Sequence, residues 1–234
     1  MEESIILFVD GLRLKGVLHM PDVEKPPVVI GSHGLFSTKD SPKQVALAGA
    51  LNKRGIAYFR FDHRGCGESD GEFKSVTSFD ARKNDLSAAI RAMTAHPKTG
   101  KRIGLFGSSM GGAACLGVGG EHDIAALVVL AAPVRLSSIR VTEATLSDTR
   151  IEGMTPEQME FDITEGLDKI SNIMIFHGDA DTVVPIENAF EIMERVREPK
   201  RIIQLSGADH PISDPALMER FIGLAVEWFE SRIL

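Results

Sequence analysis

Ser109 lies in a sequence context that favours nucleophilic chemistry. Residues 107–111 read Gly-Ser-Ser-Met-Gly and fit the pattern Gly-x-Ser-x-Gly, with Ser109 at the centre. The apolar run Ile103–Phe106 precedes this segment and predicts a strand, and a helix is expected from Ala113 onward. Ser109 would then sit in a sharp strand-to-helix turn, with its hydroxyl exposed at the C-terminal edge of a sheet. The alternative is a glycine-rich turn with no catalytic role. Other residues of the sequence are needed to distinguish the two interpretations.

A serine hydroxyl is a weak nucleophile and needs a base, together with an acid that orients the base. His210 follows the expected strand Ile202–Leu205 and is the only histidine after residue 181. Two acids, Asp179 and Asp181, follow the strand Ile173–Phe176. The chain therefore presents serine, acid and histidine in this order, each after a strand, and the sequence predicts that His210 is the base.

Backbone amides would complete such a site. Residues 32–35 read Ser-His-Gly-Leu and follow the expected strand Val28–Ile30. The Leu35 amide would pair with the Met110 amide, and the two N–H groups would stabilise the negative oxygen of a tetrahedral intermediate. His33 is interpreted as a residue that packs the loop and not as a base.

Composition and charge argue against several other classes of protein. The chain has 26 Lys and Arg against 33 Asp and Glu, a net charge of −7, which argues against a nucleic-acid partner. The longest apolar stretch, Ile124–Val134, is too short to span a bilayer. The first residues are acidic where a signal peptide needs cations. We expect a cytoplasmic protein with no membrane partner, while the oligomeric state stays open.

Cysteine usage fits this expectation. Cys66 and Cys115 are too few for a disulfide framework, and they are interpreted as two reduced thiols. We expect no metal site and no cofactor, because hydrolysis by an activated serine needs neither.

The elements that must position these residues alternate between strand and helix. A hairpin about Asp10-Gly11 opens the chain, and later apolar runs resemble parallel strands covered on both faces. The expected strands are 5–9, 12–20, 28–30, 56–61, 102–106, 125–132, 173–176 and 202–205, and the further expected helices are 42–53, 79–93, 185–196 and 215–229. The pattern predicts an α/β fold with a mostly parallel sheet of about eight strands, formed as one domain over residues 1–234.

Residues 135–170 interrupt this alternation with 36 residues that carry no strand signal. Thr155-Pro156-Glu157-Gln158 is typical of a capped helix start, and residues 138–146 are a second candidate helix. We predict a small helical insertion that covers the site, the alternative being a disordered excursion. Its apolar residues, which would line one side of a substrate groove opposite Leu35 and Phe36, are Ile139, Val141, Leu146, Ile151, Met154, Met159, Phe161, Ile163 and Leu167. From the two sides of this groove, the predicted substrate-binding residues are Phe36, Met154, Met159 and Phe161.

Together these motifs resemble the serine-dependent α/β-hydrolases over essentially the whole chain. His33-Gly34, the Asp-x-Arg-Gly-x-Gly-x-Ser loop at 62–69, the serine turn, His-Gly-x-x-Asp at 177–181 and the final histidine occur in the order of that family. The sequence is most similar to small esterases and serine aminopeptidase-like enzymes, including monoglyceride lipases and feruloyl esterases. In that branch the second acid of His-Gly-x-x-Asp belongs to the triad, which implies Ser109, Asp181 and His210 as the catalytic residues.

The resemblance implies an α/β-hydrolase fold with helices on both faces of the sheet, and an enzyme that cleaves a small-molecule ester. The insertion is shorter and more polar than a lipase lid, so we expect esters of short to medium or small aromatic acyl groups. An aminopeptidase, acyl-peptidase or thioesterase using the same triad is the alternative. A non-enzymatic interaction protein on this fold is the third hypothesis, and it would predict a lost triad member.

Overall fold

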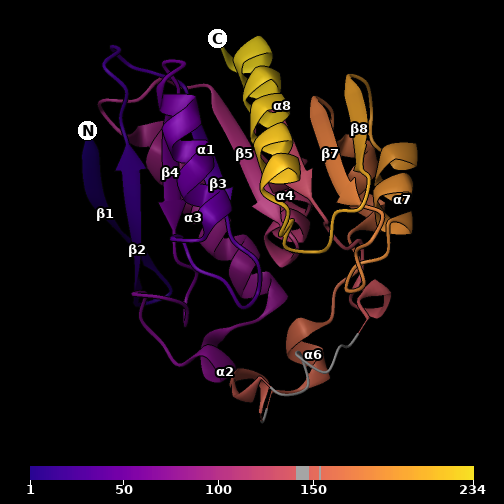
Figure 1. Cartoon of the computed structure of the whole chain (residues 1–234). Coiled ribbons are helices and arrows are strands. Elements are labelled where there is room, and N and C mark those ends of the chain that lie inside the picture. Colours follow the sequence, from indigo (N-terminus) through magenta and orange to yellow (C-terminus); the bar gives the residue numbers. More distant parts are fainter. Residues whose placement is uncertain (141–147, 153) are drawn as a thin grey trace.

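The computed structural model describes residues 1–140, 148–152 and 154–234 and contains one eight-stranded sheet (Figure 1). Its strand order is β1-β2-β4-β3-β5-β6-β7-β8, and β2 runs antiparallel to both of its neighbours while the other pairs are parallel. The strands are β1 (Glu2–Val9), β2 (Leu12–His19), β3 (Val28–Ser32), β4 (Ala57–Phe61), β5 (Ile103–Ser108), β6 (Ala126–Leu130), β7 (Ile173–Gly178) and β8 (Lys200–Leu205). The expected mostly parallel sheet of eight strands is confirmed.

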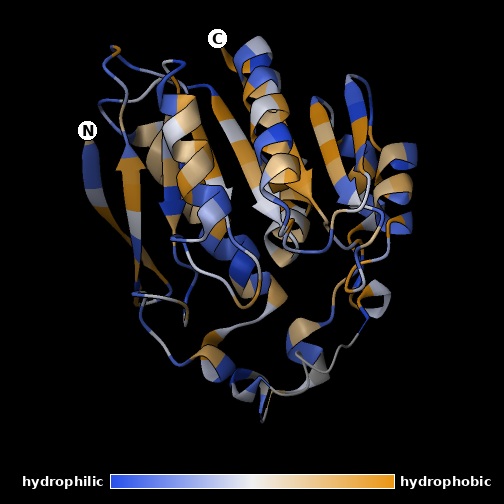
Figure 2. Ribbon diagram, in the orientation of Figure 1, coloured by the Kyte–Doolittle hydropathy of each residue, from blue (hydrophilic) through white to orange (hydrophobic). Residues whose placement is uncertain are grey.

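Helices cover both faces of this sheet (Figure 1). In the described part of the chain the α-helices are α1 (Pro42–Asn52), α2 (Phe73–Val76), α3 (Phe79–Ala95), α4 (Met110–Gly119), α6 (Pro156–Met159), α7 (Glu187–Arg195) and α8 (Pro215–Ile233). One hydrophobic core joins the sheet to α1 and α8, and a second core on the opposite face joins it to α3, α4 and α7. Figure 2 shows the matching pattern, with apolar residues along the inner strands and polar residues on the outward sides of the helices.

The opening hairpin forms because its two turn residues accept a left-handed backbone. Asp10 has φ of 50° and Gly11 has φ of 80°, as a two-residue turn of this kind requires. The turn fixes the register, so that Val9 faces Leu12 and Glu2 faces His19. This hairpin places β1 at one edge of the sheet, far along the strand order from β7 and β8.

The parallel strands bring distant parts of the sequence to one edge. β3, β5, β6, β7 and β8 are consecutive in the sheet and all run in the same direction. The loops that follow β3, β5, β7 and β8 therefore leave from the same C-terminal edge. These are the loops that carry the four predicted parts of the site.

The segment between β6 and β7 is built from short pieces. It contains α6 and short 3₁₀ helices at Leu136–Ser138, Thr149–Ile151 and Thr164–Lys169. The expected start at Thr155 is confirmed, since the Thr155 backbone amide donates to Gln158 Oε1 at 2.8 Å. Most of the second candidate helix, residues 138–146, lies outside the described residues, and so do Val141 and Leu146.

Candidate active site

Ser109 occupies the turn between β5 and α4, with backbone angles φ 55° and ψ −126°. A non-glycine residue rarely adopts such a conformation, which is strained and typical of functional sites. The turn is held by neighbours: the Ser109 amide donates to the Leu130 carbonyl at 2.8 Å. A Cβ on Gly111 would overlap the carbonyl oxygen of Ser32, so only glycine lets the turn approach β3 this closely.

His210 lies between Ser109 and Asp181. Its Nε2 is 3.0 Å from Ser109 Oγ, and its Nδ1 is 2.7 Å from Asp181 Oδ2. An ionised carboxylate accepts only, so Nδ1 carries the proton and Nε2 is left to accept the serine proton. The structure thus joins three residues that lie 29 and 101 positions apart in the sequence into one hydrogen-bonded chain.

Asp181 is held in its ionised form. Its Oδ1 accepts hydrogen bonds from the backbone amides of Val183 and Val184 at 2.8 and 2.9 Å. Burial raises the pKa of this carboxyl, but the hydrogen bond and charge of His210 and the two amides lower the pKa more. The net pKa lies below the ordinary value for aspartate, so Asp181 orients His210 as a carboxylate.

The other two acids near this site have different partners. Asp179 is exposed and accepts from the Gly207 amide at 2.6 Å and from Gln204 Nε2 at 3.1 Å, so it ties the β7 loop to the β8 loop. Asp209 accepts from the amide and the hydroxyl of Ser213, both at 2.7 Å. The structure therefore places Asp181, and neither of these two, against the histidine.

The Leu35 amide lies in the loop after β3, and the Met110 amide lies at the start of α4, directly after Ser109. A Cβ built on Gly34 would be 3.6 Å from Ser109 Cβ, so the loop after β3 packs directly on the turn that carries Ser109. Met110 is the first residue of α4, where helix amides have no acceptor within the helix. Within the described residues, neither the Leu35 amide nor the Met110 amide donates a hydrogen bond.

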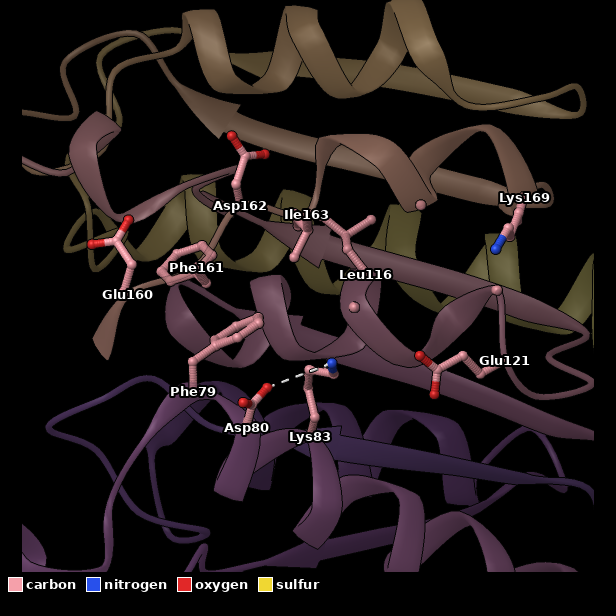
Figure 3. Close-up of a pocket in the computed structure, with 13 residues that line it drawn as sticks. Phe79, Asp80, Lys83, Leu116, Glu121, Glu160, Phe161, Asp162, Ile163 and Lys169 are labelled. Carbon is pink, nitrogen blue, oxygen red and sulfur yellow. Dashed lines mark ion pairs between the residues drawn. The ribbon is translucent and has the colours of Figure 1, made fainter. Parts of the chain in front are cut away.

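The predicted substrate-binding residues are not all placed at this site. Phe161 is 6% exposed and stacks on Phe79 of α3, with ring centroids 4.3 Å apart. Figure 3 shows these two rings beside a pocket between α3, α4 and residues 160–169, and neither Ser109 nor His210 lines this pocket. Met159 is 9% exposed in the same core. Both side chains therefore pack the insertion onto the domain, which argues against the substrate-binding role predicted for them.

Phe36 and Met154 remain candidates. Phe36 is half-buried next to Leu35, and its ring lies 5.9 Å from that of Phe73 and 4.7 Å from the Arg150 guanidinium. Met154 is half-buried and packs against the core below it. A substrate-binding role for these two side chains stays a prediction.

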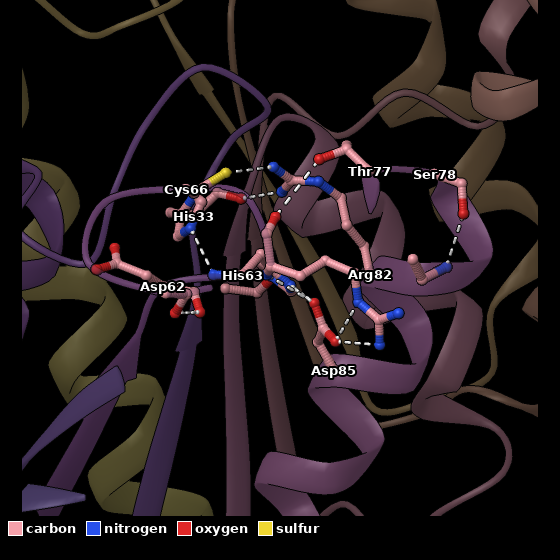
Figure 4. A network of polar contacts seen from close by, with 12 residues as sticks. His33, Asp62, His63, Cys66, Thr77, Ser78, Arg82 and Asp85 are labelled. Atoms are coloured by element: carbon pink, nitrogen blue, oxygen red, sulfur yellow. Dashed lines mark hydrogen bonds and ion pairs between the residues drawn. The ribbon is translucent and has the colours of Figure 1, made fainter. Parts of the chain in front are cut away.

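A buried polar network behind the loop after β3 was missed by the sequence reasoning (Figure 4). Asp85 on α3 accepts from the Arg64 side chain at 2.7 and 2.9 Å and lies 3.3 Å from His63 Nδ1. His63 Nε2 is 2.9 Å from Ser32 Oγ, and Arg82 on α3 reaches the same loop. One signal was available: Arg82 and Asp85 lie on the otherwise apolar face of the predicted helix 79–93.

The described residues contain neither a cluster of metal-ligating side chains nor a helix that could span a membrane. No group of three or more His, Cys, Asp or Glu side chains is arranged to hold a metal ion there. None of the helices that the structure describes is long and apolar enough to cross a membrane.

Comparisons with known proteins give a consistent result. The model of the family described as serine aminopeptidase, S33, matches residues 24–152. The protein YfhR of Escherichia coli O157:H7 is 26% identical over 211 residues, which cover 86% of this chain and 70% of that protein. The thiohydrolase aneE of Aspergillus aculeatus is 29% identical over 139 residues, covering 59% and 43%.

A solved structure shows the same architecture. Est1E from Butyrivibrio proteoclasticus, with ferulic acid bound, aligns with a TM-score of 0.80 at 21% identity over 98% of this chain and 99% of that one. The fold is therefore that of the α/β-hydrolases, as the motifs predicted.

Proposed function

This chain belongs to the serine aminopeptidase S33 family of α/β-hydrolases, and from that membership we propose that it is a serine esterase. The observation that carries the proposal is the hydrogen-bonded chain from Ser109 Oγ through His210 to Asp181, with distances of 3.0 and 2.7 Å. Ser109 lies on a strained turn at the C-terminal edge of the sheet, and this position orients its hydroxyl for attack on a substrate.

In the first half of the reaction, Ser109 Oγ attacks the acyl carbon of the ester. His210 Nε2 takes the hydroxyl proton, and the Asp181 carboxylate stabilises the imidazolium that forms. The carbonyl oxygen becomes an oxyanion, which accepts hydrogen bonds from the Leu35 and Met110 amides. Each such donor contributes roughly 3–4 kcal/mol where its loss has been measured in a related arrangement.

The intermediate then collapses with loss of the alcohol. The C–O bond to the alcohol breaks, His210 returns its proton to the departing oxygen, and the acyl group stays on Ser109 Oγ. A water molecule attacks this acyl-enzyme while His210 accepts its proton, and collapse releases the carboxylic acid and the free serine. Every proton transfer uses the same imidazole, so the reaction needs no metal and no organic cofactor.

The size of the cover supports small substrates. We regard residues 135–170 as a cap within one domain of residues 1–234; its described helices have six residues or fewer, and Met159 and Phe161 are already used in packing. Among its described residues, few other apolar side chains remain to build a long acyl tunnel. We propose esters with short to medium or small aromatic acyl groups; the ferulic acid bound to Est1E is an aromatic acid of this size.

Thioester hydrolysis is the second candidate. The similarity to the thiohydrolase aneE favours it, and the same acyl-enzyme would form from either substrate. Peptide hydrolysis would in addition need a site for the amine leaving group.

A panel of substrates with one acyl group and different leaving groups distinguishes these candidates. We expect kcat/KM for an aryl ester to exceed that for the matching thioester and anilide, and expect Ser109→Ala to abolish all three activities. In a p-nitrophenyl series from acetate to palmitate, kcat/KM should peak at a short or medium chain. A preference for the thioester would favour the second candidate, and values that climb to palmitate would favour a lipase.

A further inference from the structure

Arg82 is a charged side chain enclosed in the protein. It lies on α3, is fully buried, and burial lowers the pKa of its guanidinium. No carboxylate of the described residues lies within ion-pair distance of it, and its Nε has no hydrogen-bond partner there. Its acceptors are two backbone carbonyls and the Cys66 sulfur, at 3.1, 3.0 and 3.6 Å (Figure 4). Since an unpaired buried charge is costly, these contacts are expected to have a function.

The two carbonyls belong to the loop that follows β3. Arg82 Nη1 donates to the His33 oxygen and Nη2 to the Leu35 oxygen. The carbonyl between them, that of Gly34, is 2.7 Å from His33 Nδ1 and also accepts from the Ser37 amide at 3.2 Å. Three consecutive carbonyl oxygens are thus held by hydrogen bonds.

The His33 ring is fixed in the tautomer that this arrangement needs. The backbone amide of His63 donates to His33 Nε2 at 3.1 Å, so the ring proton resides on Nδ1 and is donated to Gly34. Burial, together with the nearby His63 and Arg82, holds the pKa of His33 well below its usual range. The ring therefore stays neutral and keeps this tautomer across the working range of pH.

These bonds determine where the Leu35 amide points. The Gly34 carbonyl and the Leu35 N–H belong to one planar trans peptide group, so they point in opposite directions. Glycine at position 34 makes rotation of this peptide easy. A flipped peptide would present a carbonyl oxygen, and not an N–H, to the oxyanion at Ser109. Holding all three carbonyls prevents that rotation.

We propose that Arg82, acting with His33, is a positioning residue that holds the Leu35 amide toward the oxyanion. The inference rests on the proposed serine-hydrolase function. On this proposal the buried Arg82 of α3 helps to stabilise the transition state and not the bound substrate. The reason is that the Leu35 amide is needed only when the negative oxygen develops.

Two substitutions test this role. Arg82→Lys keeps a cation but loses the planar fork that spans two carbonyls, and Arg82→Met removes the buried charge at similar length. With p-nitrophenyl acetate, and with rates counted per site titrated by a fluorophosphonate, we expect kcat to fall roughly 10- to 100-fold. KM should change less than about threefold, because substrate binding in the ground state does not use the amide.

A second readout separates this role from general structural support. A trifluoromethyl ketone adds to Ser109 and forms a tetrahedral oxyanion, so its inhibition constant should rise by about the factor by which kcat/KM falls. Cys66→Ser, which alters an Arg82 contact outside the loop, is the matched control and should stay within about twofold of wild type.

The outcomes are distinguishable. An unchanged kcat per titrated site in either Arg82 variant, or a rise in KM with an unchanged ketone affinity, would overturn the positioning role. An equal loss in Cys66→Ser would overturn it too. A wild-type protein that hydrolyses no ester and reacts with no fluorophosphonate would instead overturn the proposed function itself.

Discussion

Neighbouring residues of the same type have different roles in this protein because the backbone places them differently. Ser108 ends β5 and is 8% exposed, whereas Ser109 has φ of 55° and contacts His210. Asp179 and Asp181 are two residues apart, yet only Asp181 lies against the histidine. Chemical identity alone therefore could not assign the site, and the backbone conformation after each strand decides it.

The two aspartates provide a matched pair of substitutions. In Asp181→Asn the amide cannot act as an ionised acceptor for His210, so we expect kcat to fall roughly 10²- to 10⁴-fold. Asn at position 179 can still accept from the Gly207 amide, so the activity of Asp179→Asn should stay within about threefold of wild type. Steady-state kinetics on one aryl ester checks both variants, and the opposite ranking would refute the assignment of Asp181.

At the scale of helices and strands, the sequence predicts those elements that a local pattern of apolar and turn residues determines. The strands and long helices were predicted because apolar runs with turn residues mark them, and observed ends differ by up to a few residues, as for β1 at Glu2–Val9 against the expected 5–9. α2 was missed because a four-residue helix carries too little periodicity. The arrangement of Ser109, His210 and an acid after β7 could be predicted because each of these residues follows a strand, while the choice of Asp181 over Asp179 depended on the resemblance to the family.

The features that the sequence did not predict depend on contacts between residues that are far apart in the chain. Nothing in the local sequence shows that Arg82 meets the carbonyls of residues 33 and 35, which lie 49 and 47 positions away. Phe161 was assigned to a substrate groove because its apolar character fits one, but its partner Phe79 lies 82 positions away on α3. Residues that pack an element and residues that line a pocket share the same chemistry, so the sequence could not separate them.

At the scale of the whole molecule, the buried histidines behind the active site link folding stability to pH. Burial, together with the charge of Arg82, lowers the pKa of His63 to about 4, despite the opposing effect of Asp85. The pKa of His33 is shifted in the same direction. In the unfolded chain a histidine titrates near its ordinary pKa of about 6.5. Between these two values the unfolded chain binds more protons than the folded protein, so stability falls as the pH falls.

We predict the size of this effect for His63. The shift corresponds to about 2 kcal/mol of stability lost between pH 7.5 and pH 5, rising to about 3 kcal/mol below pH 4. Urea unfolding at pH 7.5 and pH 5 measures the change for the wild type and for His63→Gln. The variant should lose about 2 kcal/mol less than the wild type over this interval, and an equal loss in both proteins would show that His63 is not held neutral by the fold.

The most direct test of the central claim is the site of modification by a fluorophosphonate. This reagent phosphonylates a serine that has a working base and oxyanion donors, so mass spectrometry of the digested protein should find one adduct, on Ser109. Ester hydrolysis should be lost in proportion to labelling, Ser108→Ala should still be labelled, and Ser109→Ala should be neither labelled nor active. An adduct on Ser108, or hydrolysis at the wild-type rate by Ser109→Ala, would contradict the role of Ser109 as the nucleophile.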